Sequence, residues 1–460
     1  MRPGSHQLGD RAVVAVAVAL VLGMWQGPIA VSLGLLIGLL GRARPFVIGL
    51  LVVASLLGWW SGVRAWQQAQ PRHLGDYTGW AEIIGDPAPY GNGLRVTVEI
   101  DGERFDAWVY GGARRKLAAH QGGEYVWLDG RRTALSASQR RALIRHVVGR
   151  FQVEATGDVL EGSAFARASN RIRTSLRGAA EATLGADEAA LFAGLVIGDD
   201  ARQPEWMLTD FRASGMSHLT AVSGQNVGFV LAAALPLLRR LRPWWRWAAT
   251  VGVIGWFMAL TRFEPSVLRA GVMAMLAATA YVRGQQVRPV RVLALACGLL
   301  ALIDPLLVWS VGFWLSVGAT VGVCTVGPWL ESRLPGPAWL RLPMAVTLGA
   351  QVGVALPSIL VFGRLPVVSL PANLAAVPVA GFVMLYGLPA GLLASFLPDW
   401  LQSVVMAPAA LGTRWVATVA RVAAAIEPSP GWSAVWWVIG LIALAGWWWR
   451  SRSRRAGVPI

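Results

Sequence analysis

A succession of long apolar stretches is the feature that most restricts how this 460-residue chain can fold. The hydrocarbon core of a bilayer is about 30 Å thick, and a helix of about 20 apolar residues crosses it. Hydrophobic residues make up 55% of the chain and charged residues only 14%, so we expect a polytopic α-helical membrane protein. From residue 216 onward the pattern predicts about nine spans, near 216–238, 247–261, 266–282, 290–303, 306–330, 342–362, 367–396, 400–425 and 432–449.

The arginines between these stretches indicate how the chain is oriented. They gather at 239–246, 283–291, 333–341 and 450–455, and an even number of predicted spans separates each group from the next. Loops rich in Arg and Lys stay in the cytoplasm. All four groups are cytoplasmic if residues 73–160 lie outside the membrane, and residues 450–460 then form a basic cytoplasmic tail.

Residues 1–72 are predicted to be N-terminal transmembrane segments, with apolar runs at 11–24, 28–40 and 45–63. Because more apolar sequence follows the first run and no clear cleavage site is present, we interpret that run as a retained anchor. The first two runs are short for complete spans, so a re-entrant hairpin is an open alternative.

Residues 73–160 differ from the rest because their apolar runs are short and turn residues recur. Polar and apolar residues alternate in Leu94 to Ile100 and in Phe105 to Tyr110, as in half-buried strands. Glycine-containing turns, among them Asp101-Gly102 and Asp129-Gly130, are typical of hairpins. The stretch therefore predicts a small β domain.

Charge is unevenly distributed along this β domain. Residues 76–106 hold seven acids against two arginines, whereas residues 114–150 hold nine bases against two acids. Arginine binds phosphate through its planar fork, which favours a DNA-binding face. Contact with anionic lipid head groups is an equally good interpretation. The candidate DNA-binding residues are Arg114, Arg115, Lys116, Arg131 and Arg132.

Residues 161–187 are predicted to contain an amphipathic helix at the membrane surface, over 163–184. Its apolar stripe is Phe165, Ile172, Leu176 and Ala180, and four arginines supply charge. Asp199 follows this region and either caps a helix or lines a polar path, and capping is the simpler interpretation.

The stretch Ser214 to Val230 opens the apolar region but is unusually polar. In hydrocarbon an unsatisfied polar group costs several kcal/mol, so these side chains must face protein or water. In a single helix Thr220, Ser223 and Asn226 follow one another along one side, although Gly224 favours a break. Two interpretations stay open: small and hydroxyl residues that pack helices closely, or a polar path beside a broken helix.

Within this stretch, SHLTAVSGQNV resembles the motif of the ComEC family, the DNA-uptake channels of bacterial competence, whose usual form is close to SHLLAISGLHV. Gln225 and Asn226 depart from that form, because the family often has Leu and His there. Similar segments follow in the family's order, and together they cover roughly residues 190–400. They are TRFEPSVLRA, Asp304-Pro305 with VGFWLS, and Gln351 and Pro357 ahead of LPANLAAVPVA.

Several polar residues of these segments fall inside predicted spans. Arg269 either extends back to the interface or faces a cavity as a phosphate contact, and the resemblance favours the cavity. Pro357, Asn373 and Pro378 predict broken helices, which are tolerated only where the backbone lines protein or water.

The resemblance implies that residues 188–449 are a competence-type channel domain in the cytoplasmic membrane and that residues 73–160 are an OB-like barrel outside it. The implied function is inward transport of single-stranded DNA during natural transformation. Membrane lipids and a separate DNA receptor, cytoplasmic ATPase and nuclease are the implied partners. The implied channel-lining residues are His218, Thr220, Ser223, Gly224, Gln225, Asn226, Arg262, Glu264, Arg269, Asp304, Gln351 and Asn373.

Motifs for catalysis are missing from the sequence. Neither the HxHxDH motif of the metallo-β-lactamase-like domain found in many family members nor GxxxxGK[ST] occurs, so we expect a short form that is not an enzyme. The five His and two Cys residues show no metal-ligand spacing, and we expect no metal and no cofactor.

Two other functions stay open. Ser223 and His218 are the candidate nucleophile and base of an intramembrane serine hydrolase, but five residues separate them, which places them on different sides of a helix. A small-molecule transporter is the third interpretation, and no inverted repeat is evident to support it.

Overall fold

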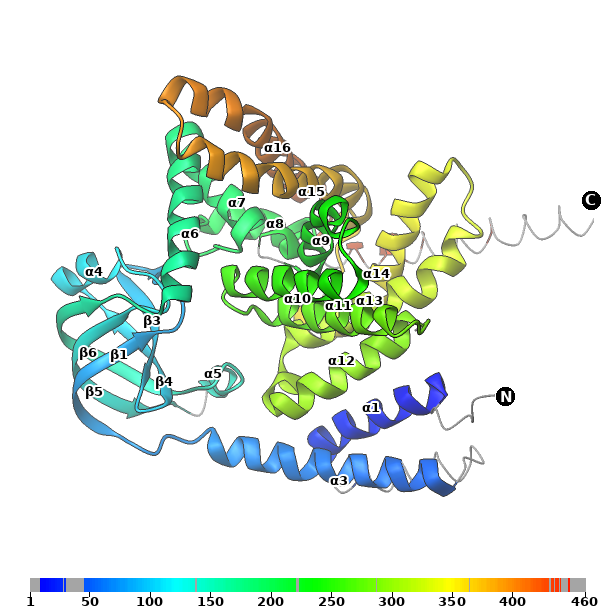
Figure 1. Ribbon diagram of the computed structural model, residues 1–460, viewed down its shortest axis with the longest axis horizontal. Helices are drawn as coiled ribbons and strands as arrows, with labels where there is room; N and C mark the ends of the chain where they lie inside the picture. Colours follow the sequence, from blue (N-terminus) through cyan, green and yellow to red (C-terminus); the bar gives the residue numbers. More distant parts are fainter. Residues whose placement is uncertain are drawn as a thin grey trace, which may run out of the picture.

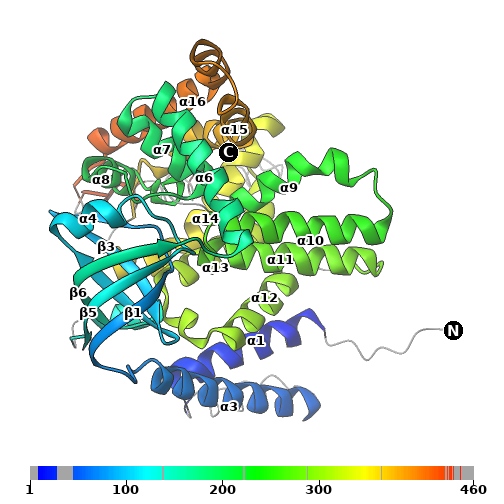
Figure 2. The same cartoon turned by 60° about the vertical axis from the view of Figure 1, so that its left-hand side comes forward.

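The computed structural model describes residues 9–27, 29, 45–136, 139–220, 223–286, 288–363, 365–429, 432–433, 435–437, 439 and 446. A β domain lies at one side of a larger helical body (Figure 1). The two N-terminal helices run along one edge of that body, below the β domain in the turned view (Figure 2).

The N-terminal helices are α1 (Asp10–Gln26) and α3 (Pro45–Gln68). Leu20 packs against Gly58 and Met24 against Gly62, so the two helices run side by side in the same direction (Figure 1). A side chain on Gly58 would collide with the backbone of α1, and one on Gly62 would be tightly confined there, so these small residues permit close helix packing. The first and third predicted runs are confirmed as helices, and the run at 28–40 lies almost entirely outside the described residues.

Six strands form the β domain. They are β1 (Gly75–Ile83), β2 (Ala88–Tyr90), β3 (Gly93–Ile100), β4 (Glu103–Val109), β5 (Tyr125–Ala134) and β6 (Val147–Leu160). The pairing order is β1-β5-β6-β4-β3-β2, and β1 also pairs with β3, so five strands close in a ring. Phe105, Leu128 and Phe151 are among its fully buried side chains. The predicted β domain is confirmed, and its assignment as an OB-like barrel stays a prediction.

One predicted turn of this domain is confirmed and another is wrong. Asp101 and Gly102 join β3 to β4 with φ of 53° and 75°, as a tight hairpin requires. Asp129 and Gly130 instead lie inside β5, at a shift of its register against β6. A side chain on Gly130 would collide with the carbonyl of Gln152, so this glycine marks a close backbone approach.

Two short helices, α4 (Gly111–Leu117) and α5 (Arg140–Leu143), complete the β domain. The chain then enters the helical body through α6 (Ala164–Thr183), α7 (Ala186–Ile197), α8 (Glu205–Ala213) and the 3-10 helix η2 (Ser217–Leu219). Ser163 caps α6 by accepting a hydrogen bond from the N–H of Ala166. Of the predicted apolar stripe, Leu176 and Ala180 are buried where α6 packs on α15 and α16, whereas Phe165 is 55% exposed.

The remaining elements correspond closely to the predicted spans between 216 and 425. They are α9 (Gly224–Leu238), α10 (Pro243–Leu260), α11 (Pro265–Val282), α12 (Pro289–Ile303), the 3-10 helix η3 (Pro305–Trp309), α13 (Val311–Glu331), α14 (Ala338–Phe362), α15 (Ser369–Ala394) and α16 (Asp399–Ile426). Proline opens α10, α11 and α12, where its missing N–H leaves no hydrogen bond unmade. Most of the span predicted at 432–449 and the tail at 450–460 lie outside the described residues.

Six helices among the described residues are long and apolar enough to cross a membrane: α3, α11, α13, α14, α15 and α16. The helices α9 and α12 are also apolar, but each has 15 residues. The polytopic helical class is therefore confirmed.

The prediction of broken helices at Pro357, Asn373 and Pro378 is wrong. The helix α14 continues past Pro357, and α15 continues past Asn373 and Pro378. The amide of Asn373 donates to the carbonyl oxygen of Ser369 at 2.7 Å, one turn earlier in the same helix. Membrane helices tolerate proline where neighbouring helices and side chains satisfy the freed backbone groups.

Candidate functional site

The polar stretch Ser214 to Val230 is not one helix. The 3-10 helix η2 ends at Leu219, and α9 begins at Gly224 with Ser223 in the N-cap position. The Thr220 hydroxyl donates to the carbonyl oxygen of Ser217 at 2.8 Å, a local bond that competes with helix continuation. The interpretation with a broken helix is therefore the one that the backbone supports.

Three predicted channel-lining residues meet around one small cavity. His218, Gln225 and Asn226 border it, together with Leu195 of α7 and Gly381 of α15. The cavity measures about 10 Å³, which is on the order of the space that one water molecule needs. The other lining residues are apolar or glycine, and His218 and Gln225 are also exposed, so the three polar side chains gather at a small pocket where α7, α9 and α15 meet.

Hydrogen bonds fix the polar stretch against its neighbours. Asn226 Nδ2 donates to the carbonyl oxygen of Leu195 at 3.2 Å, near the C-terminus of α7. Gln203 Nε2 donates to the carbonyl oxygen of Thr220 at 2.8 Å. Leu195 lies in the last turn of α7 and Thr220 directly follows η2. Carbonyls at such helix ends have no partner within the helix. The amides therefore act as caps for the discontinuous backbone.

A second polar cluster lies beside the start of the stretch. Gln351 Nε2 donates to Ser369 Oγ at 2.6 Å, and Asn373 Nδ2 donates to the same oxygen at 3.1 Å. A side chain on Gly215 would lie 2.8 Å from Ser369 Cβ, so the segment before η2 passes directly over this cluster. The structure thus brings two further predicted residues together through a serine that the sequence analysis did not select.

The other predicted channel-lining residues are dispersed. Gly224 packs against α11, where a side chain would meet Ala270 Cβ at 2.9 Å. Glu264 occupies the N-cap position of α11. Asp304 accepts from the N–H of Leu306 and lies 3.0 Å from His146 Nε2 of the β domain. They therefore mark helix ends and contacts between helices.

Arg269 lies inside the helical body. Its side chain is 2% exposed, and Nε donates to Ser316 Oγ of α13 at 3.0 Å. The guanidinium carbon lies 5.5 Å from the centre of the Phe313 ring of α13, and the role of Arg269 as a phosphate contact stays a prediction.

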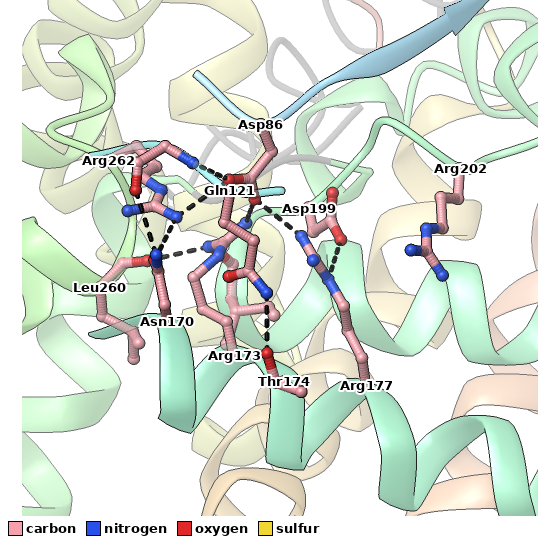
Figure 3. A network of polar contacts seen from close by, with 12 residues as sticks. Asp86, Gln121, Asn170, Arg173, Thr174, Arg177, Asp199, Arg202, Leu260 and Arg262 are labelled. Carbon is pink, nitrogen blue, oxygen red and sulfur yellow. Dashed lines mark hydrogen bonds and ion pairs between the residues drawn. The ribbon is translucent and has the colours of Figure 1, made fainter. Parts of the chain in front are cut away.

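Arg262 belongs to a network centred on Asp86, which lies between β1 and β2 (Figure 3). Asp86 Oδ1 accepts from Arg262 Nη2 at 2.9 Å. Asp86 Oδ2 accepts from the Nη2 atoms of Arg173 and Arg177 of α6, each at 2.7 Å. A single carboxylate of the β domain thus binds three arginines of the helical body.

Burial by itself would raise the pKa of Asp86, but Arg173, Arg262 and Arg177, together with the N–H of Gly122, hold that pKa well below its usual range. The carboxylate is therefore ionised at every physiological pH, and the network is a permanent arrangement of charges.

Arg173 also binds the ends of two helices. Its Nη1 donates to the carbonyl oxygens of Ile197 and Leu260, each at 2.9 Å, and these are the last residues of α7 and α10. The C-terminus of a helix carries partial negative charge and unpaired carbonyls, so a cation is favourable there. Arg173 therefore joins α6, α7 and α10 at one point.

The interpretation of Asp199 as a helix cap is wrong. The helix α7 ends in a left-handed turn at Gly198, and Pro204 occupies the N-cap position of α8. The carboxylate of Asp199 instead accepts from Arg177 Nε at 2.6 Å. The sequence analysis did not select Asp86, and it treated Arg173 as one of four arginines that give charge to a helix at the membrane surface. The contact between Asp86 and Arg173 spans 87 positions of the chain, so no local pattern indicates it.

The candidate DNA-binding residues have different surroundings. Arg115 and Lys116 are exposed on α4, beside Arg114, whose Nη1 donates to the carbonyl oxygen of Asn92. Arg132 donates to Asp101 at 2.8 Å and covers the ring of Tyr77. Arg131 lies 3.5 Å from Asp76 of the paired strand β1. Acidic residues of 76–106 therefore lie beside basic residues of 114–150 in the folded domain. The two charges are separated along the sequence but not in space.

A family model described as "Competence protein" matches residues 195–452, which is more than half of the chain. The chain belongs to the competence protein family. The matched region of this family member includes every predicted channel-lining residue. Asp86, Arg173 and Arg177 precede it, as do the candidate DNA-binding residues. With its apolar helices, this family member is a multi-pass membrane protein.

Two curated proteins are similar to this family member. It is 25% identical over 252 residues to ComE operon protein 3 of Bacillus subtilis (strain 168), with 54% of this chain and 32% of that protein aligned. It is 26% identical over 213 residues to the uncharacterized protein YcaI of Escherichia coli (strain K12), with 42% of this chain and 28% of that protein aligned. The alignments therefore span a third or less of each relative. No solved structure matches the chain.

Proposed function

We propose that this competence family member forms a channel in the cytoplasmic membrane through which single-stranded DNA moves inward during natural transformation. Family membership supports a role in DNA uptake. The proposal goes further than family membership in three points. The DNA passes through this chain, it is single-stranded, and it moves inward.

The discontinuity between η2 and α9 is the observation that carries the proposal. Among the described residues of the helical body, the helical structure is interrupted between η2 and α9, and His218, Gln225 and Asn226 border a small pocket there. Irregular backbone at membrane depth is tolerated where it lines protein or a water-filled path. The water-sized pocket fits a closed state of such a path, which opens when α9 and α15 separate.

The hydrogen bonds of Ser223 favour this channel over the hydrolase. Its hydroxyl lies 3.3 Å from Asn226 Oδ1, to which it donates. A nucleophilic serine needs its hydroxyl directed at a general base. The geometry therefore supports a structural role for Ser223 at the start of α9.

We assign the β domain to the outer side of the membrane, as an OB-like barrel that receives the strand. Arg115 and Lys116 on α4 are the best placed phosphate contacts because they are exposed and outside the ion pairs described above. Arg131 and Arg132 share their charge with acids of neighbouring strands. A separate DNA receptor, a cytoplasmic ATPase and a nuclease are the proposed partners, together with membrane lipids.

The test of the channel is DNA uptake in a naturally transformable host whose copy of this chain has been deleted and replaced by variants. We expect the deletion to abolish entry of labelled DNA and Gln225→Leu to reduce it strongly, because an apolar side chain then borders the polar pocket. Gly228→Leu is the matched control, since a side chain there meets nothing within 4 Å. Normal transformation by the deletion strain would disprove the proposal.

The DNA contacts are tested separately on the full chain in neutral-lipid discs. Binding of an oligothymidine should weaken steeply with salt, because each neutralised phosphate releases counterions. We expect Gln at residues 114–116 to reduce the salt slope, and Gln at residues 131–132 to change it less. Equal salt slopes for the wild type and the first variant would favour lipid contact for α4.

A further inference from the structure

Two tryptophans form an accessible aromatic surface on the outer face of the β domain. Trp80 of β1 and Trp127 of β5 are directly opposite each other in the sheet, and each is 38% exposed. Their ring centroids are 5.5 Å apart, with the ring planes at 79°. In the turned view β1, β5 and β6 lie at the front of the β domain, with no helix in front of them (Figure 2).

Neighbouring strands fix the ring of Trp127. A side chain on Gly157 of β6 would come within 2.9 Å of Trp127 Cδ1, so the indole lies directly against that glycine. Trp80 contacts the same indole edge to face. Rigid aromatic side chains offer contact area to a partner at a low cost in conformational entropy.

Carboxylates flank the tryptophan pair along both strands. Glu82 follows Trp80 by two positions, and Asp129 follows Trp127 by two positions, so each carboxylate lies on the same face of its strand as the indole. Neither Glu82 nor Asp129 forms an ion pair with a described residue. The pair of indoles therefore lies between two negative charges that have no basic partner in the described part of the chain.

The pairing of β1 with β3 adds a third negative charge. Glu99 is directly opposite Glu82, and like charges in that position repel each other. The hydroxyl of Tyr125 donates to Glu82 Oε2 at 3.1 Å. Glu82 raises the pKa of Tyr125 through this hydrogen bond and through its charge, and Glu99 adds to the effect. A cation that approaches this face would relieve the repulsion.

Trp206 shows how the chain surrounds an exposed tryptophan elsewhere. This residue of α8 is 41% exposed, and the guanidinium carbon of Arg421 lies 4.8 Å from its ring centre. The ring quadrupole attracts a cation placed over the face of an indole. Among the described residues, no arginine or lysine lies over Trp80 or Trp127.

We infer that the outer face around Trp80 and Trp127 is a docking surface for another protein, and that the docked segment presents arginine side chains. A planar guanidinium stacks on an indole and pairs with a carboxylate such as Glu82 or Asp129. Charge complementarity selects this occupant, because the carboxylates repel the phosphates of DNA and of anionic lipids. The surface and its partner do not depend on the proposed channel.

The experiment measures binding of a short fluorescein-labelled peptide of alternating arginine and glycine to the full chain in discs of neutral phosphatidylcholine. The chain carries a net charge of +16, so it has no general attraction for a cationic peptide. We expect saturable binding by the wild type in fluorescence anisotropy. Trp127→Leu should weaken the dissociation constant about tenfold, because the indole face is lost.

Glu82→Gln is the second variant, because it removes the charge and keeps an acceptor for Tyr125. It should weaken the dissociation constant up to about fivefold at an unchanged unfolding midpoint. This variant keeps the test decisive if Trp127→Leu does not fold. A wild type that binds no arginine peptide, or a folded Glu82→Gln and a folded Trp127→Leu that bind like the wild type, would overturn the inference.

Two matched controls locate the effect. Trp206→Leu is the same substitution at a tryptophan that already has an arginine of its own. Glu181→Gln removes an exposed carboxylate of α6 that pairs with Arg202. Both should bind the peptide like the wild type, and equal weakening by a control and its test variant would contradict a site on the β domain.

Other occupants of this face give different results. If Trp127→Leu weakens binding of an oligothymidine and leaves the arginine peptide unaffected, the tryptophans stack on bases and the inference is wrong. If the wild type self-associates in analytical ultracentrifugation, and Trp127→Leu abolishes that association without a change in peptide binding, the occupant is a second copy of this chain. That result would also reject an arginine-bearing partner.

Discussion

Asp86 is a single carboxylate that faces three arginines, and its replacement tests the network at the residue scale. Removing one member of a buried ionic group leaves the others unpaired, which typically costs about 3–5 kcal/mol. We expect Asp86→Asn to lower the unfolding midpoint of the full chain markedly and to make the β domain more sensitive to protease. Asp76→Asn is the control, because that side chain is 88% exposed and its pair with Arg131 contributes about 0–1 kcal/mol.

The pH dependence of the same network has a definite sign. The folded-state pKa of Asp86 lies below the usual value of about 3.9, so the network stabilises the fold above that pH. Its contribution is lost as the pH falls from there through the folded-state pKa. We expect the difference in midpoint between wild type and Asp86→Asn to stay constant from pH 8 to about pH 5 and to shrink below about pH 4. A difference that changes between pH 8 and 6 would assign the effect to another group.

Ser223→Ala separates the channel from the hydrolase. The substitution removes the hydrogen bond to Asn226 Oδ1, a loss of about 1 kcal/mol. We therefore expect nearly normal DNA uptake at a normal level of protein in the membrane. A fully inactive Ser223→Ala at normal abundance would contradict the channel and favour a nucleophilic serine.

At the scale of elements, α13 and α14 pack backbone to backbone. A side chain on Gly322 would collide with the carbonyl of Gly349, and one on Gly353 with the carbonyl of Gly318. Small residues let membrane helices pack backbone to backbone. We expect Gly322→Val to destabilise the fold by about 1–3 kcal/mol, because the added side chain overpacks the contact. A lower unfolding midpoint in detergent measures this loss.

A matched substitution on the same helix tests whether the packing or the loss of a glycine matters. A side chain at Gly312 would meet only Ser310 Oγ, at an ordinary 3.7 Å. Gly312→Ala should be neutral or stabilising by up to about 1 kcal/mol, since alanine is the better helix former. Equal destabilisation by both substitutions would contradict the close-packing argument.

At the scale of the whole molecule, the arginine loops predict the orientation of the chain in the membrane. We expect a reporter inserted at the exposed turn Asp101-Gly102 to be outside and one inserted after Gly284, between α11 and α12, to be in the cytoplasm. Accessibility of the two reporters to a membrane-impermeant label in intact cells measures this. Labelling of both from the same side would require a different number of spans between them.

The sequence by itself determined the elements of this protein. Apolar length, proline at helix starts and Asp-Gly at a hairpin are local properties, so the helices of the body and the β3–β4 turn were predicted close to their observed bounds. The sequence also indicated that the polar residues of the motif at 217–227 lie together, because they are adjacent in the chain, but it left open whether they pack helices or line a path. The prolines of α14 and α15 misled the prediction, since proline alone does not reveal whether neighbouring helices compensate for a lost hydrogen bond.

Only the tertiary structure decided which polar groups are paired. Asp86 meets Arg173 and Arg262 across 87 and 176 positions, and no local pattern encodes such contacts. Arg173 is one of four arginines of an amphipathic stretch and Arg269 is the one arginine of α11, and both are buried. Among the described residues a carboxylate and two helix ends bind the terminal nitrogens of Arg173, whereas those of Arg269 have no hydrogen-bond partner. Burial makes that difference decisive, because a charge removed from water depends on its partners for stability.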